Sequence, residues 1–203
     1  MTSPLPPPRA RLTTLPNMLG LVRIGATPVV MALVLLPFPG GGLIAWGVFA
    51  VASATDWFDG RIARARGQVT PLGIFMDLTA DKVLVAGTLI AMVEIGLLPA
   101  WIVATLLIRE LVVQGMRQLA ASDNVVIPAR VLGKYKAFGT NLAVGVLLLA
   151  FDAQTGGPLA GLGITGAMET LGYWMAVAIT ALSVVSGLAY LRDVLPLLMG
   201  RRD

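Results

Sequence analysis

The sequence predicts an all-α integral membrane protein with six spanning helices. Of its 203 residues, 57% are hydrophobic and only 13% carry a charged side chain, whereas about a quarter of the residues of an ordinary soluble domain are charged. The mean hydropathy is +0.84, and apolar runs near the spanning length of about 20 residues recur along the whole chain. We therefore expect a single membrane domain over residues 13–203, without a separate soluble domain.

The first twelve residues differ from the rest of the chain. Residues 1–12 are rich in Pro and basic and have no apolar core, so we expect a flexible or interfacial arm rather than a signal peptide or a span. Six apolar runs of about spanning length follow. The expected spans are 18–37, 43–64, 73–95, 98–121, 131–151 and 171–192. The fourth is the least regular, because Arg109, Glu110 and Arg117 interrupt it.

The positive side chains indicate how these spans are oriented. The connections at 37–42, near Pro99 and at 152–170 contain no Lys or Arg. The positive-inside tendency therefore places both termini in the cytoplasm. The Gly-rich segment 154–167 lacks the Lys and Ser/Thr of a phosphate-binding loop, and we expect a flexible external loop. The basic residues on the cytoplasmic side are Arg9, Arg11, Arg61, Arg64, Arg66, Arg130, Lys134, Lys136, Arg201 and Arg202.

The composition also restricts the partners and the possible metals. The net charge is +4, with Lys and Arg beside apolar segments, which suits anionic lipid headgroups. No nucleic-acid-binding motif accompanies the charge, so we expect no nucleic-acid partner. The chain contains no Cys and no His, so a metal must be held by oxygen ligands. Oxygen ligands favour hard cations such as Mg²⁺ or Mn²⁺.

Four aspartates near the ends of the second and third predicted spans are the main functional signal. Asp56 and Asp59 are three residues apart, and Asp77 and Asp81 are four apart, so each pair lies on one helix face. The short connection 65–72 would make the two helices antiparallel neighbours and bring their acidic ends together. Uncompensated carboxylates at a membrane are costly. We therefore expect a pair of divalent cations among them.

Small residues accompany these carboxylates. Gly60 lies one turn beyond Asp56, and Ala63 and Gly73 lie one turn from other aspartates of the set. They would let two helices and a bulky ligand approach closely. The alternative is a set of separate helix-end charges, solvated or paired with nearby Arg and Lys. The spacing, with Gly, Ala and Arg interleaved, favours the metal site.

Residues 56–81 read D-x2-D-G-x2-A-R-x8-G-x3-D-x3-D, a pattern that resembles the signature of the CDP-alcohol phosphatidyltransferases. The resemblance implies a six-helix membrane fold, usually homodimeric, with a polar cavity that opens to the cytoplasm and a centre of two Mg²⁺ or Mn²⁺ ions. The implied metal ligands are Asp56, Asp59, Asp77 and Asp81, with Asp81 also the proton acceptor. The implied CDP-binding residues are Asn17, Asp56, Gly60, Ala63, Arg64, Thr70 and Gly73.

The chemistry of such a reaction agrees with these residue types. Divalent cations neutralise a pyrophosphate and stabilise the departing CMP, and Arg64 can donate hydrogen bonds to phosphate oxygens. The attacking alcohol needs a proton acceptor. In a chain without His, a carboxylate is the natural choice.

Three further stretches, at 15–24, 109–117 and 133–136, resemble bacterial phosphatidylglycerophosphate synthases. The resemblance implies an inner-membrane enzyme that transfers a phosphatidyl group from CDP-diacylglycerol to sn-glycerol 3-phosphate. Arg109 and Arg117 are about 80° apart round a helix, so both can face one cavity. The expected acceptor-phosphate ligands are Arg109, Arg117, Lys134 and Lys136. Only one of the two lysines is expected to make direct contact, and lipid-headgroup contact or pairing with Glu110 is the alternative for these cations.

Two other functions stay open at this point. Gly20, Ala137 and Thr140 depart from the synthase pattern, which leaves a sibling transferase with another acceptor, such as inositol phosphate, as the nearest alternative. A small transporter that binds cations at its acidic cluster is the alternative from a different class. The aspartates lie at the membrane boundary rather than near the midplane, which favours the enzyme.

Overall fold

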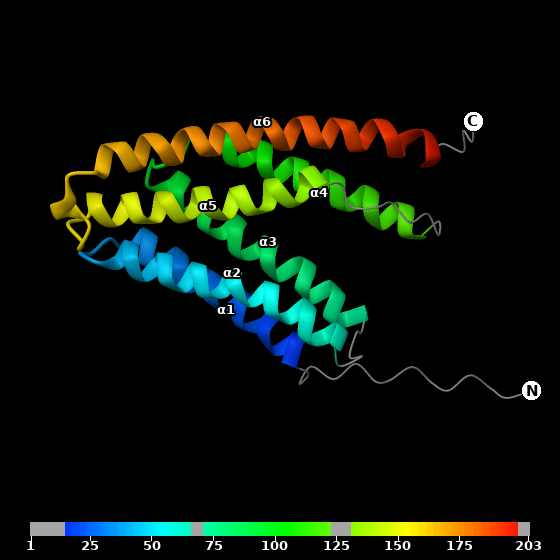
Figure 1. The fold of residues 1–203 in the computed structure, drawn as a ribbon, viewed down its shortest axis with the longest axis horizontal. Helices are drawn as coiled ribbons and strands as arrows, with labels where there is room; N and C mark the ends of the chain where they lie inside the picture. The colour runs from blue at the N-terminus through cyan, green and yellow to red at the C-terminus, as the bar shows by residue number, and fades with distance from the viewer. Residues whose placement is uncertain (1–14, 66–70, 123–130, 199–203) are drawn as a thin grey trace, which may run out of the picture.

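The computed structural model describes residues 15–65, 71–122 and 131–198, and within these ranges all regular structure is helical (Figure 1). Within these ranges, side chains are not described at 15–17, 56–65, 71–75, 77–78, 121–122, 131–134 and 196–198. The long helices are α1 (Leu15–Leu35), α2 (Gly41–Ala65), α3 (Pro71–Glu94), α4 (Ala100–Ser122), α5 (Val131–Gln154) and α6 (Thr165–Leu198). A single 3-10 turn, η1 (Ala160–Leu162), precedes α6. The predicted all-α fold with six long helices is confirmed.

The helices are those of a membrane protein. Three described stretches are long and apolar enough to cross a membrane, namely Met18–Leu35, Tyr135–Gln154 and Thr165–Leu195. The described part of α2 adds a shorter apolar stretch, Gly41–Thr55. Many large apolar side chains of the described residues are exposed, among them Val185 and Leu188 of α6. Exposed apolar side chains in this number suit lipid rather than water.

The helices form two groups that meet at one end (Figure 1). In the first group α1 packs on α2 and α3, and in the second α6 packs on α4 and α5. The contact of α2 with α5 joins the two groups, and a core that includes Leu84, Met92, Ile102 and Leu148 lies between them. The ribbon shows the groups diverging away from the loops at 36–40 and 155–164.

Close packing fixes the register of α3 against α1. A methyl group added at Gly87 of α3 would lie 2.5 Å from Cγ2 of Thr27 and 3.1 Å from Sδ of Met31, both on α1. Only glycine allows the two backbones to approach this far, as small residues commonly do between membrane helices. This packing sets the position of α3, which carries two of the predicted metal ligands, Asp77 and Asp81.

A buried carboxylate organises the loops where the two groups meet. The side chain of Asp152 on α5 is 0% exposed and accepts hydrogen bonds from the backbone N–H groups of Leu43 (3.0 Å) and Leu159 (3.3 Å). A methyl group at Gly42 would lie 2.4 Å from the backbone N of Asp152, so α2 begins directly against α5. Asp152 therefore ties the start of α2 to the loop that follows α5.

The last helix and the loop before it differ from the prediction. The sequence predicts a sixth span at 171–192 after an external loop at 154–167, whereas α5 ends at Gln154 and α6 covers Thr165–Leu198. The prediction followed the apolar run, but helical hydrogen bonding continues through polar residues such as Glu169 at its start. The loop is correspondingly short, contains η1, and turns at Gly163, whose φ is 65°.

Candidate active-site cavity

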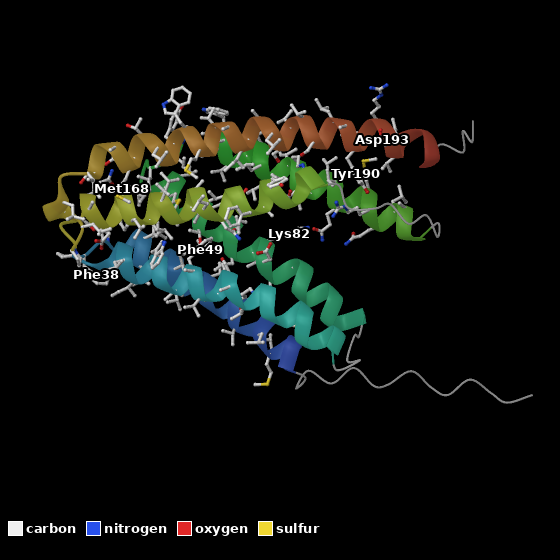
Figure 2. The ribbon with its side chains drawn as sticks, viewed as in Figure 1. Phe38, Phe49, Lys82, Met168, Tyr190 and Asp193 are labelled. Atoms are coloured by element: carbon white, nitrogen blue, oxygen red, sulfur yellow. The ribbon has the colours of Figure 1, made fainter. Side chains whose placement is uncertain are left out.

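A cavity of about 400 Å³ lies between α3, α4 and α5. Its walls combine polar and apolar side chains, and Figure 2 labels Lys82, which lies on the α3 wall. The polar lining includes Asp81, Lys82, Glu110, Gln114, Lys136 and Asn141. The apolar lining includes Val85, Leu89, Leu106 and Leu107. Pockets with a mainly apolar wall and a few convergent polar groups are the usual form of ligand sites.

The structure places the aspartate motif on the two helices that the spacing predicts. Asp56 and Asp59 lie on α2, and Asp77 and Asp81 lie on α3, with only residues 66–70 between the two helices. Asp81 is the one aspartate of the four whose side chain the structure describes; it is partly buried and lines the cavity. The motif and the cavity therefore share Asp81.

The remaining predicted CDP-binding residues lie on three helices and, in one case, outside the described residues. Gly60, Ala63 and Arg64 lie on α2, Gly73 on α3, and Asn17 on the first turn of α1. The side chains at these positions are outside the part that the structure describes, and Thr70 lies outside the described residues altogether. Their predicted roles stay predictions.

The donor set suits a hard divalent cation. The four aspartates supply only carboxylate oxygens, and the chain has no His or Cys to compete for a softer metal. They lie towards the end of α2 and in the first three turns of α3. Among the residues whose side chains the structure describes, no group of three metal-ligating side chains occurs, since three of the aspartates are not among them.

An ion pair between α4 and α5 forms part of the cavity wall. The ammonium group of Lys136 donates to Oε1 of Glu110. Lys136 is only 7% exposed, so its charge requires a partner. Pairing with Glu110, the alternative left open for Lys136, is therefore present, and Lys136 still lines the cavity. The side chain of Lys134 is outside the described part of the structure.

The two arginines of α4 contact α6. Arg109 donates from Nε to the backbone O of Ser183 (3.1 Å) and from Nη2 to Oγ of Ser186 (3.0 Å). The guanidinium of Arg117 lies 5.4 Å from the centroid of the Tyr190 ring, a cation–π arrangement. The two arginines thus share a face of α4, as their spacing predicts, but the structure does not bring them into the lining of the cavity. Their role in binding acceptor phosphate stays a prediction.

Three charged residues that the sequence reasoning did not assign to the site lie in the cavity wall or contact the residue before the aspartate motif. Lys82 and Glu110 line the cavity. Arg23 on α1 is 0% exposed and donates from Nε to Oγ1 of Thr55 (3.3 Å), the residue before Asp56. Charged residues inside apolar segments are the signal that could have identified all three.

Comparisons with known proteins extend over nearly the whole chain. The sequence model of the CDP-alcohol phosphatidyltransferase family matches residues 13–185. The chain is 38% identical over 191 residues to a CDP-diacylglycerol–glycerol-3-phosphate 3-phosphatidyltransferase of Bacillus subtilis, with 87% of this chain and 92% of the relative covered. It is 39% identical over 196 residues to a probable phosphatidylglycerophosphate synthase of Mycobacterium tuberculosis, with 92% of this chain and 86% of the relative covered. A cardiolipin synthase (CMP-forming) of Oryza sativa is 32% identical over 211 residues, with 97% of this chain and 62% of the relative covered.

Proposed function

This chain belongs to the CDP-alcohol phosphatidyltransferase family, and from that premise we propose that it transfers the phosphatidyl group of CDP-diacylglycerol to sn-glycerol 3-phosphate. The products are phosphatidylglycerophosphate and CMP. The observation that carries the proposal is one cavity lined both by Asp81, the last residue of the aspartate motif, and by the cation Lys136. The names of the relatives in Bacillus subtilis and Mycobacterium tuberculosis support the same acceptor.

The aspartates hold two Mg²⁺ or Mn²⁺ ions in this proposal. Asp56, Asp59, Asp77 and Asp81 are the ligands, which the oxygen-only donor set supports. When bound, such ions neutralise the pyrophosphate and stabilise the charge that develops on departing CMP. The CDP group is held beside them by residues of α1, α2 and the start of α3. These are Asn17, Asp56, Gly60, Ala63, Arg64, Thr70 and Gly73.

Asp81 accepts the proton of the attacking alcohol. The primary hydroxyl oxygen of glycerol 3-phosphate forms a bond to the β-phosphorus of CDP-diacylglycerol, and its proton passes to the Asp81 carboxylate. The bond from that phosphorus to the oxygen of CMP breaks, and CMP leaves with the bonding electron pair. The position of Asp81 in the cavity wall, where it can reach an acceptor, supports this role.

The phosphate of the acceptor is bound by the cations of α4 and α5. Among the predicted cations whose side chains the structure describes, Lys136 lines the cavity, which favours it as a direct ligand. Lys134, Arg109 and Arg117 complete the predicted set. The cavity is also lined by the apolar residues Val85, Leu89 and Leu106 and by the exposed Leu111, which supports a path for the acyl chains from the cavity into the bilayer.

The enzyme resides in the bacterial cytoplasmic membrane in this proposal, with both termini and the cavity on the cytoplasmic side. The absence of Lys and Arg from the connections at 37–42, near Pro99 and at 152–170 supports this orientation. A homodimer is part of the proposal, on the strength of the family resemblance.

The test is CMP release by the purified full chain in mixed micelles that contain CDP-diacylglycerol. Glycerol 3-phosphate, inositol phosphate, inositol and serine are supplied separately, each with Mg²⁺, with Mn²⁺ or with EDTA. We expect release only with glycerol 3-phosphate and a divalent cation. Release with inositol phosphate instead would assign the chain to the sibling transferases. Cation flux into proteoliposomes, without CMP release for any acceptor, would support the transporter.

A further inference from the structure

We propose that Glu110 is a positioning residue for the acceptor: its carboxylate holds the ammonium group of Lys136 at the cavity wall, in place to receive the acceptor phosphate. This inference rests on the proposed function and adds to it a residue outside the aspartate motif and outside the predicted set of phosphate-binding cations. It also gives Arg109 an indirect role, because Arg109 fixes Glu110.

The contact between Glu110 and Lys136 crosses from one helix to another. Glu110 is on α4 and Lys136 is on α5, and both line the cavity. Lys136 is 7% exposed, and a lysine side chain has four rotatable bonds, so an ammonium group without a partner would leave this place or lose its proton. The carboxylate of Glu110 therefore keeps a charged group at a defined position in a largely buried part of the wall.

Glu110 is itself held by a side chain anchored on α6. Nη1 of Arg109 donates to the same oxygen, Oε1 of Glu110, over 2.7 Å. The other donors of the guanidinium bind the backbone O of Ser183 and Oγ of Ser186. The planar fork of an arginine fixes the direction of each hydrogen bond. The order of contacts thus runs from α6 through Arg109 and Glu110 to Lys136 at the cavity.

The charges at the wall suit exchange of one anion for another. Lys82 on α3 lines the same cavity as Glu110, Lys136 and Asp81. A bound phosphate monoester, which carries close to two negative charges at neutral pH, can take over contact with Lys136 while Glu110 keeps Arg109. The pair thus presents a charged ammonium group to the acceptor without leaving it uncompensated beforehand.

Glu110→Gln tests the proposal, because glutamine keeps the shape and removes the charge. In mixed micelles with CDP-diacylglycerol, we expect the KM for glycerol 3-phosphate to rise about tenfold or more. The kcat and the KM for CDP-diacylglycerol should change by about threefold at most. An unchanged or lower KM for glycerol 3-phosphate would overturn the proposal. Wild-type protein without glycerol 3-phosphate-dependent CMP release would instead contradict the proposed function.

A double-mutant cycle asks whether Glu110 acts through Lys136. The KM for glycerol 3-phosphate is measured for Glu110→Gln, Lys136→Met and the double variant. If Glu110 only positions Lys136, its substitution has little further effect once Lys136 is absent. If the KM of the double variant instead rises by the product of the two single effects, Glu110 does not act through Lys136 and the proposal is overturned.

A pair of glycines gives a test that leaves all the charged residues in place. A methyl group at Gly187 of α6 would lie 3.0 Å from Cγ and 3.3 Å from Nε of Arg109, whereas Gly115 of α4 has nothing within 4 Å. We expect Gly187→Ala to raise the KM for glycerol 3-phosphate about threefold and Gly115→Ala to leave it unchanged. Equal KM values in the two variants would contradict the role of Arg109.

Discussion

The carboxylate of Asp152, near the end of α5, accepts a hydrogen bond from the backbone N–H of Leu43, near the start of α2, although 109 residues separate the two in sequence. The distance is 3.0 Å, and the second carboxylate oxygen accepts from Leu159. This contact joins the two helix groups at the end where the loops 36–40 and 155–164 meet (Figure 1). The divergence of the groups that leaves room for the cavity starts from this junction.

Replacement of Asp152 by Ala should destabilise the fold more than it affects the chemistry. The substitution leaves the N–H groups of Leu43 and Leu159 without their acceptor, and a lost hydrogen bond to a charged group costs about 1.5–3 kcal/mol. We expect the free energy of unfolding in detergent to fall by about 2–5 kcal/mol, with CMP release per folded molecule within about twofold of wild type. The control is Glu94→Ala, an exposed carboxylate on α3. A comparable loss in the control would show that Asp152 has no special role.

Gly87→Ala should separate α1 from α3. The added methyl group meets Thr27 at 2.5 Å, which forces a backbone shift at a cost of about 1–3 kcal/mol. Gly25→Ala on α1 is the matched control, because nothing lies within 4 Å of the added group. Thermal unfolding in detergent measures both variants. Equal stability of the two would show that α1 and α3 do not pack as described.

Arg23→Met should lower stability because the guanidinium is buried and hydrogen-bonded. Arg23 is 0% exposed and donates to Thr55, and the loss of a hydrogen bond that involves a charged group costs about 1.5–3 kcal/mol. Thr55→Val removes only one neutral partner and should cost about 1 kcal/mol. Chemical unfolding measures the loss of stability in both variants and in the control Arg192→Met, which replaces an exposed arginine. A cost for Arg192→Met as large as that for Arg23→Met would contradict the prediction.

Asp59→Asn should abolish CMP release without unfolding the protein. An amide oxygen is a weaker metal ligand than a carboxylate, and loss of metal stabilisation of about 3 kcal/mol lowers the rate about 100-fold. An assay of CMP release tests the loss of activity, and circular dichroism of the same preparation tests whether the helices are retained. Wild-type turnover in this variant would overturn the metal assignment.

Chelation should remove activity reversibly. Treatment with EDTA strips ions held by carboxylates, and added Mg²⁺ or Mn²⁺ should restore CMP release because hard cations suit oxygen ligands. Ca²⁺, which prefers longer bonds and more ligands, is expected to restore less. Full activity after exhaustive chelation would exclude a role for metal.

The fold was predictable because its signals are local. Each long helix follows from an apolar run, and the placement of Asp56 with Asp59 and of Asp77 with Asp81 on continuous helices follows from spacing alone. The extra length of α6 was not predictable from hydropathy, because backbone hydrogen bonds continue where the apolar run stops. Helix ends depend on such details more than helix existence does.

The site was predictable only in part because it depends on which helices are neighbours. The spacing of Arg109 and Arg117 places them on one face of α4, but it cannot say that this face meets α6. Glu110, one position along and about 100° round the helix, is the charged residue of that stretch that lines the cavity. The partner of Asp152 lies 109 residues away, beyond the reach of any periodic pattern.

The apolar wall of the cavity at Val85, Leu89 and Leu106 has a kinetic consequence. A lipid that enters along such a wall arrives from a two-dimensional pool, so its availability depends on its mole fraction among the surrounding lipids rather than on its concentration in the sample. The acceptor arrives from bulk water. Addition of inert lipid at constant total CDP-diacylglycerol lowers the mole fraction of that lipid and should therefore slow the reaction. Dilution with buffer leaves the mole fraction unchanged and should slow the reaction only by lowering the concentration of glycerol 3-phosphate.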